Sequence, residues 1–216
     1  MKKYIKIAAF AVALIGFTTS KAQEGAVDVY DEGDQLFGIN YSIGFPDGEF
    51  RDFIEKTSWR GFNLEYDIFV AQNLSVGFTA GYRLFNQTDD KSTYELERGN
   101  AGIAVTAKIW RYTHLVPLQA NLKYYYAPSF DSWVHFFGGL GLGTTYVNQE
   151  AWVGLNTIKD DDWRFSMAPD FGLEIATGGM SNIQISAQYL YILNGHNDED
   201  PLTSYNLKVG YKKWIK

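Results

Sequence analysis

The chain has 216 residues, no cysteine, and 25 acidic against 19 basic side chains, which gives a formal charge of −6. This surplus of negative charge argues against nucleic acid as a partner, because the phosphate backbone attracts basic surfaces. The length suits one domain, and an exported chain without cysteine must be stabilised by packing, hydrogen bonds or lipid rather than by disulfides. Aromatic residues make up 17% of the chain. Such an excess is typical of proteins that meet a membrane interface, although composition alone also fits a soluble β-sandwich.

The first 22 residues have the organisation of a secretory signal peptide. Three lysines precede an apolar stretch over residues 7–17, which is too short to span a bilayer. Ser20 and Ala22 then occupy the −3 and −1 positions of a plausible cleavage site. We therefore expect residues 1–22 to be a cleaved signal peptide and the mature chain to begin at Gln23.

The mature chain alternates apolar and polar residues with a period of two. From Phe37 to Phe45, for example, the odd positions are apolar while glycine, asparagine and serine lie between them. This alternation is typical of a β-strand whose two faces meet different surroundings. The same pattern predicts eight strands, at residues 35–45, 58–70, 73–86, 114–126, 132–147, 163–176, 181–193 and 203–215.

The predicted strands are long, about a dozen residues each, whereas strands of soluble domains usually have ~5–6 and roughly 9–11 tilted residues cross a bilayer. Short turns near Ala71, Pro128 and Gly178 alternate with longer connections. Those connections lie near Phe50 and over residues 86–113, 148–163 and 194–203. The fold class predicted is all-β, a closed eight-stranded antiparallel up-and-down transmembrane β-barrel spanning residues 23–216, with both termini in the periplasm. Alternation alone would also permit a soluble sandwich or lipocalin; strand length, aromatic content and the signal peptide favour the membrane.

Three segments resemble a known family. They are Val116–Tyr125, the glycine-rich run Gly138–Gly143 and the closing segment Leu207–Tyr211. With the rest of the mature chain, they resemble the small eight-stranded outer-membrane β-barrel proteins typified by the OmpA-like transmembrane domain. The resemblance implies an outer-membrane location in a Gram-negative envelope. It implies little about function, because no catalytic motif defines this family.

The polar face of the strands carries charges of both signs. In a barrel of eight strands the interior is only wide enough for side chains to fill, so these charges should meet across the lumen and pair. The predicted lumen charge network consists of Glu65, Asp67, Arg83, Lys123, Arg164, Asp170, Glu174, Lys208 and Lys212. Inward glycines would leave room for the long stems. One interpretation is a plugged lumen that holds the barrel in register; the alternative is a narrow gated conduit, whose conductance would change when Glu65 and Asp67 become Gln and Asn.

No catalytic, cofactor or metal site is predicted, and we expect the protein not to be an enzyme. The three histidines, His114, His135 and His196, lie on different segments, whereas zinc or triad chemistry needs converging ligands. His114 is expected at the lipid-facing rim, where the neighbouring strands offer no obvious serine nucleophile. The acidic groups at 160–162 and 198–200 are expected to be solvated loop tips; binding of Ca²⁺ or Mg²⁺ that bridges to lipopolysaccharide phosphates is the alternative.

The longest predicted loop, 86–113, is unusually apolar over residues 102–110. It is expected to extend the third and fourth strands as a hairpin, to dock on a partner, or to pack with loop 148–163, including Trp152, Leu155 and Trp163, and so cap the barrel. The function expected is that of a non-enzymatic outer-membrane barrel, monomeric or part of an envelope complex. It would sit in outer-membrane lipid and lipopolysaccharide and serve envelope structure or protein binding through its loops. A narrow passive channel for small solutes and an outer-leaflet lipid-modifying enzyme are the alternatives.

Overall fold

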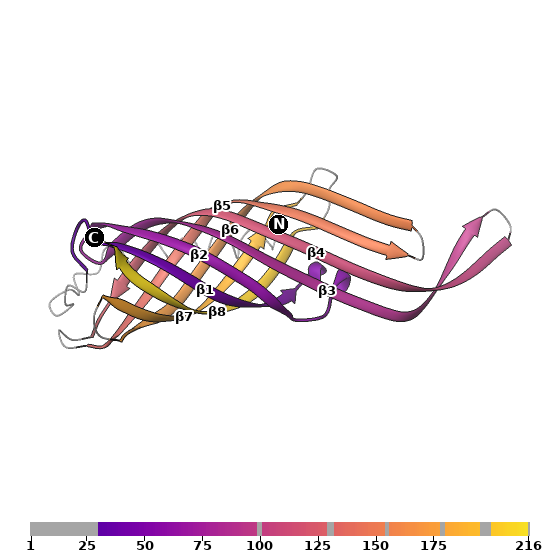
Figure 1. Cartoon of the computed structure of the whole chain (residues 1–216). Helices are drawn as coiled ribbons and strands as arrows, with labels where there is room; N and C mark the ends of the chain where they lie inside the picture. The colour runs from indigo at the N-terminus through magenta and orange to yellow at the C-terminus, as the bar shows by residue number, and fades with distance from the viewer. Residues whose placement is uncertain are drawn as a thin grey trace.

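A computed structural model describes residues 30–98, 101–128, 132–153, 156–177, 180–194 and 200–215. The predicted signal peptide and its cleavage site therefore lie outside the described residues. The described chain forms eight antiparallel strands that close into a barrel in simple sequence order (Figure 1). The strands are β1 (Gln35–Asp47), β2 (Ser58–Ala71), β3 (Leu74–Arg98), β4 (Ala101–Tyr126), β5 (Val134–Val153), β6 (Asn156–Ala176), β7 (Ser181–Ile192) and β8 (Leu202–Ile215). This confirms the predicted fold class.

The barrel closes between its first and last strands. β1 pairs with β8 along its whole length, from Gln35 opposite Ile215 to Asp47 opposite Thr203. Each described strand therefore has a hydrogen-bonded neighbour on both sides. Hydrocarbon offers no partner for a free backbone N–H or C=O, and a closed sheet is the strand arrangement that meets this demand.

Three short connections lie at the end of the barrel that holds the C-terminus (Figure 1). Between β2 and β3, Ala71 pairs with Leu74, which leaves only Gln72 and Asn73 in the turn. Asn73 has a φ of 61°, in the left-handed region that asparagine tolerates better than most residues. In the topology expected from the sequence, short turns mark the periplasmic end, and the opposite end is called the extracellular end below.

Two of the connections at the extracellular end, β3–β4 and β5–β6, are extended hairpins where the predicted strand bounds left loops; for β3–β4 this confirms the interpretation that the third and fourth strands extend as a hairpin. Expected strand ends at 86, 114, 147 and 163 are wrong, because β3 and β4 stay paired up to Arg98 opposite Ala101, and β5 and β6 up to Val153 opposite Asn156. The resulting hairpins project well beyond the barrel (Figure 1). Polar residues such as Asn86 and Gln87 indicated a loop because they break the apolar alternation. Above the membrane, however, both faces of a ladder meet water, and the ladder continues without that alternation.

A short helix interrupts the β1–β2 connection and was not predicted. α2 (Glu49–Phe53) follows Gly48, which has a φ of 58° and whose Cα approaches the Thr203 side chain so closely that a Cβ would lie 3.2 Å from its hydroxyl oxygen. Glycine adopts this backbone conformation without steric penalty, so the chain can turn inward here. Among the described residues, no helix is long and apolar enough to cross a membrane.

Candidate functional site: a filled lumen

The barrel wall separates side chains by face as the alternation predicts. Large apolar residues such as Phe78 and Leu207 are exposed on the outside, whereas polar side chains are buried within the lumen. The structure buries all nine residues of the predicted lumen charge network: Glu65, Asp67, Arg83, Lys123, Arg164, Asp170, Glu174, Lys208 and Lys212. Seven of them, all except Arg83 and Arg164, are joined by ion pairs into one connected cluster, called the lumen salt-bridge network below.

Two lysines hold the middle of this network. The Lys123 Nζ lies 2.9 Å from Glu65 Oε2 and 3.0 Å from Asp67 Oδ2. The Lys208 Nζ lies 2.8 Å from Glu65 Oε1 and 2.6 Å from Asp170 Oδ2. Each carboxylate oxygen of Glu65 therefore pairs with one of the two lysines. Through these ion pairs, strands β2, β4, β6 and β8 are connected across the lumen.

Lys212 closes the network at its periplasmic side. Its Nζ lies 2.9 Å from Asp67 Oδ2 and 2.9 Å from Glu174 Oε1, and it donates to the Tyr125 hydroxyl at 3.3 Å. The same ammonium group lies 5.6 Å from the centre of the Phe137 ring, within the range of a cation–π contact. Buried charges are tolerated when every ion is paired and hydrogen-bonded, which this geometry achieves for Lys212.

Glycines make room for the lysine stems. Gly139 lies opposite Lys123 in the β4–β5 ladder, and Gly38 lies opposite Lys212 in the β1–β8 ladder. A Cβ on Gly139 would lie 2.7 Å from Lys123 Cγ, and one on Gly38 would lie 2.8 Å from Lys212 Cγ. Only a residue without a side chain lets both stems lie against the wall.

The two arginines make separate contacts. Arg83 Nη2 donates to Gln188 Oε1 at 2.9 Å, and its Nε donates to the Ser42 hydroxyl at 3.1 Å. Arg164 Nη2 lies 3.4 Å from Asp160, four residues earlier on the same strand. Asp160 is a carboxylate outside the lumen salt-bridge network, so Arg164 has at least one partner at the extracellular end of its own strand.

An aromatic floor closes the periplasmic end of the lumen. It consists of Tyr30, Leu36, Phe69, Tyr125 and Phe137, with Trp214 packed against it. Tyr30 stacks on Phe69 with ring centres 4.3 Å apart and meets Tyr125 edge-on at 5.0 Å. Tyr30, which precedes β1, therefore packs inside the end of the barrel.

The Tyr30 hydroxyl ties this floor to the salt-bridge network. It donates to Glu174 Oε2 at 2.7 Å and accepts from Asn182 Nδ2 at 2.9 Å. Tyr30 precedes the first membrane-spanning strand. Burial, followed by the negative charge of Glu174, raises the pKa of its hydroxyl well above the ordinary value. The phenol therefore keeps its proton and remains a hydrogen-bond donor to Glu174.

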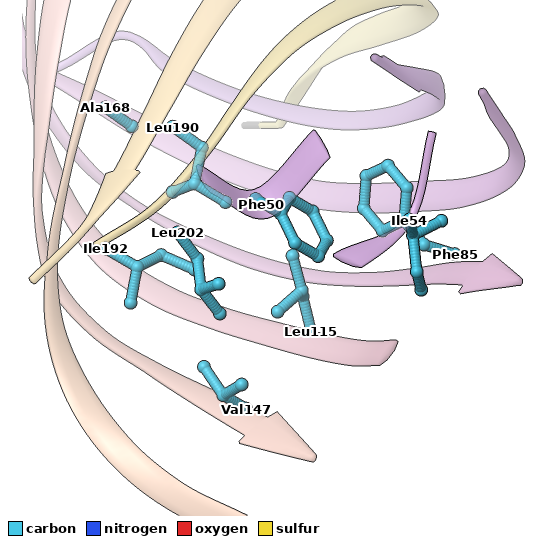
Figure 2. Packing of buried hydrophobic residues seen from close by; sticks show 9 residues of the cluster. All are labelled: Phe50, Ile54, Phe85, Leu115, Val147, Ala168, Leu190, Ile192 and Leu202. Carbon is cyan, nitrogen blue, oxygen red and sulfur yellow. The ribbon is translucent and has the colours of Figure 1, made fainter. Parts of the chain in front are cut away.

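An apolar cap closes the extracellular end. It consists of Phe50, Ile54, Phe85, Leu115, Val147, Ala168, Leu190, Ile192 and Leu202. These nine side chains gather into one group between α2 and the surrounding strands (Figure 2). Phe50 meets Phe85 edge-on with ring centres 5.0 Å apart. The upper lumen is therefore a packed hydrophobic core and not a polar passage.

The wall of the β3–β4 hairpin anchors α2 in the mouth. Arg111 Nη1 donates to the Phe53 carbonyl oxygen at 3.2 Å and pairs with Asp89 at 3.2 Å. The Gln87 side chain accepts from the Glu55 backbone N–H at 2.7 Å. The hairpin that extends above the membrane thus also holds the cap in place.

The cap and the floor were missed in the sequence, although a signal for each exists. At 189–193 the chain reads Tyr-Leu-Tyr-Ile-Leu, and at 124–126 it reads Tyr-Tyr-Tyr. Both runs lack the polar alternate residues of the mid-wall strands. A strand that is apolar on both faces is in contact with lipid on one side and with a dry interior on the other, and these runs mark the two ends of the lumen.

The histidines and the acidic groups show no convergence. His114 Nδ1 lies 2.8 Å from the Tyr82 hydroxyl on the outer face. Asp161 accepts from the Tyr146 hydroxyl at 3.0 Å. His196 and the acidic residues 198–199 lie outside the described residues. Within the part of the chain that is described, no group of three or more His, Asp or Glu side chains is placed to hold a metal ion.

Comparison with known proteins agrees with this architecture. The family model of the outer membrane protein beta-barrel domain matches residues 9–212. The chain belongs to this family. It is therefore an outer-membrane β-barrel protein, as the resemblance of its sequence implied. No curated protein sequence is significantly similar to it.

Solved structures of three small barrels are also similar. Ail of Yersinia pestis, crystallised with the heparin analogue sucrose octasulfate, is 17% identical, with a TM-score of 0.47 over 85% of this chain and 99% of Ail. Neisserial surface protein A (12% identity) and OprG of Pseudomonas aeruginosa (14% identity) each give a TM-score of 0.47 over 88% of this chain and 99% of theirs. At such identities a shared architecture does not imply a shared ligand or activity.

Proposed function

We propose that this protein is a non-conducting, non-enzymatic outer-membrane barrel that presents its β3–β4 and β5–β6 hairpins to a protein partner at the cell surface. The observation that carries the proposal is the filled lumen. The aromatic floor, the salt-bridge network and the apolar cap follow one another along it, and each is packed or paired. A barrel without a passage offers function only through its outer surface and its extracellular hairpins.

The hairpins have the properties of a binding surface. β3 and β4 contain 25 and 26 residues, against 12 in β7, so about half of each lies beyond the membrane-spanning length. On the β5–β6 hairpin Trp152 and Ile158 are exposed, and Trp152 lies opposite Trp110 of β4. Aromatic side chains exposed to water are characteristic of protein interaction sites. A partner protein bound to these hairpins would be anchored to the outer membrane by the barrel, and the two proteins would form an envelope complex.

The refolded protein is expected to be electrically silent in planar bilayers, because the apolar cap and the aromatic floor are packed across the two ends of the lumen. The measurement is single-channel conductance of a barrel whose folding has been checked by heat-modifiable migration on a gel. Discrete openings that change in E65Q and D67N would contradict the closed barrel. They would support the second candidate, a narrow passive channel. That candidate is favoured by the shortness of α2, which has only five residues.

A photo-crosslinking amino acid at Trp152 is expected to give a discrete protein adduct in intact native cells, because this side chain lies on the water-exposed hairpin. Leu142 is the matched control. It lies on the same strand and the same face and has the same exposed fraction, 44%, but it faces lipid. Adducts from neither position, or equally from both, would contradict partner binding through the hairpin. The readout is the mass of the adducts on a denaturing gel, followed by identification of the bound peptide.

A further inference from the structure

A hollow lies on the outer wall of the barrel, over strands β6, β7 and β8. Its volume is about 620 Å³, and residues lining it include Met167, Pro169, Phe171, Ala187, Tyr189 and Leu207. Every outer-membrane barrel has an apolar belt, so apolarity alone carries no meaning here. The shape of this hollow, and not its apolarity, is therefore the informative feature.

The sequence explains why the wall is hollow at this place. In one row across the three strands, Ala187 lies between Phe171 on β6 and Leu207 on β8. A methyl group between two large side chains leaves a trough one residue wide. On β8 and β7, Tyr205 and Tyr189 lean together with ring centres 4.8 Å apart and bound the trough on its extracellular side.

Pro169 adds a second irregularity beside the trough. The β6–β7 ladder pairs Met167 with Tyr191 and Asp170 with Gln188, but no pair is formed by Ala168 or Pro169. Proline has no N–H to donate, so it cannot complete the ladder at this point. The regular packing of β6 against β7 is therefore interrupted directly beside the trough.

We propose that this trough is a binding site for one acyl chain of a lipid in the extracellular leaflet. Its depth in the membrane supports this leaflet. β7 begins at the periplasmic turn with Ser181 and ends at the extracellular side with Ile192, and Ala187, Tyr189 and Tyr191 all lie in its outer half. Tyrosine hydroxyls collect at the interface between hydrocarbon and water, where they can donate to the ester and headgroup oxygens of the lipid.

The dimensions of the trough favour a single hydrocarbon chain over a protein. Phe171 and Leu207 stand on strands two places apart, which corresponds to roughly 10 Å between their backbones before side-chain width is subtracted. A transmembrane helix with side chains is about 10–12 Å across and would not enter. A second copy of the barrel, related by a two-fold axis, would place the same hollow against itself and leave a void. A flexible acyl chain is narrow enough to enter the trough and can follow its shape without leaving a void.

The test uses a photoactivatable phospholipid and two tryptophan variants. The refolded protein is placed in phosphatidylcholine bilayers that contain a small fraction of phosphatidylcholine with a diazirine in its acyl chain. Labelled peptides are then quantified by mass spectrometry. A187W fills the trough, and A120W is its control. Ala120 also faces lipid, on β4, and lies six residues from the periplasmic end of its strand at Tyr126, as Ala187 lies six residues from Ser181.

Labelling of the β6–β8 peptides is expected to exceed that of β3–β4 peptides at the same depth by about tenfold, which corresponds to a preference of about 1.4 kcal/mol. A187W should abolish this excess and A120W should leave it unchanged; A187L serves the same purpose if A187W fails to refold. Even labelling around the wall that A187W does not alter would overturn the proposal. So would crosslinking of the trough to a second barrel, since a protein and not a lipid would then cover it.

Discussion

Replacing Lys212 with methionine is expected to lower the free energy of unfolding by about 3–5 kcal/mol, the range found when one partner of a buried ion pair is removed. Methionine has a similar length and volume but no charge. Glu174 and Asp67, each 2.9 Å from the Lys212 Nζ and both buried, would lose their shared cation, and Asp67 would keep only Lys123. The measurement is urea-induced unfolding of the refolded barrel, followed by tryptophan fluorescence.

The neighbouring residue supplies the control. Lys213 follows Lys212 on β8 but is exposed on the outer face at the periplasmic end. K213M should change the free energy of unfolding by no more than about 0.5 kcal/mol, as is usual for surface substitutions. The double variant K212M/E174Q should recover part of the stability lost in K212M, because it removes the charge of Glu174, which pairs with Lys212, while Asp67 keeps its ion pair with Lys123. Equal losses in K212M and K213M would mean that the network contributes no specific stability.

The wall of the barrel could be predicted because its physics is local. Because the side chains of a strand alternate with a period of two, odd and even positions face lipid and lumen in turn. A register shift of one residue would move every apolar side chain of the strand from the lipid face to the lumen face. For this reason the sequence placed Glu65, Lys123 and Lys208 inside the barrel, where the structure shows them buried and in contact. Which lysine meets which carboxylate depends on barrel stagger, and alternation carries no information on that.

The two ends of the lumen could not be predicted in the same way. Phe50 and Tyr30 belong to segments outside the strands, and neither has a periodic pattern around it. Their positions are decided by a tertiary demand, namely that the apolar inner faces of strand ends such as Leu190 and Tyr125 be covered. The runs of residues that are apolar on both faces reveal this demand, but they do not say which segment meets it.

The lengths of the outer hairpins were underestimated for a related reason. Apolar and polar residues alternate where one face of a strand meets lipid and the other meets the lumen. Above the membrane both faces meet water, so the alternation is lost. At Asn86 and Gln87 the β3–β4 ladder continues with polar residues on both faces. A polar stretch between two transmembrane strands therefore does not separate a loop from an extended ladder, and cross-strand pairing decides the matter.

Replacing Phe85 with alanine is expected to lower the free energy of unfolding by about 3–5 kcal/mol, since this loss combines transfer of the ring with the cavity left in a packed core. Phe85 is fully buried in the apolar cap. Phe78 on the same strand makes a matched control, because it is 48% exposed on the opposite, lipid-facing side. Lipid fills the space that F78A leaves, so only the transfer contribution, about 1.5–3 kcal/mol, should be lost there.

The contact between α2 and the wall is tested by combining F85A with F50A. The two rings meet edge-on at 5.0 Å, a geometry whose coupling in double-mutant cycles is about 0.5–1.5 kcal/mol. Coupling in this range would show that α2 is docked in the folded barrel in solution, which the closed lumen requires. Additive losses, together with an F85A loss no larger than that of F78A, would mean that α2 does not pack in the mouth. The lumen would then be open to water down to the salt-bridge network, and the narrow channel would become the better account of the protein.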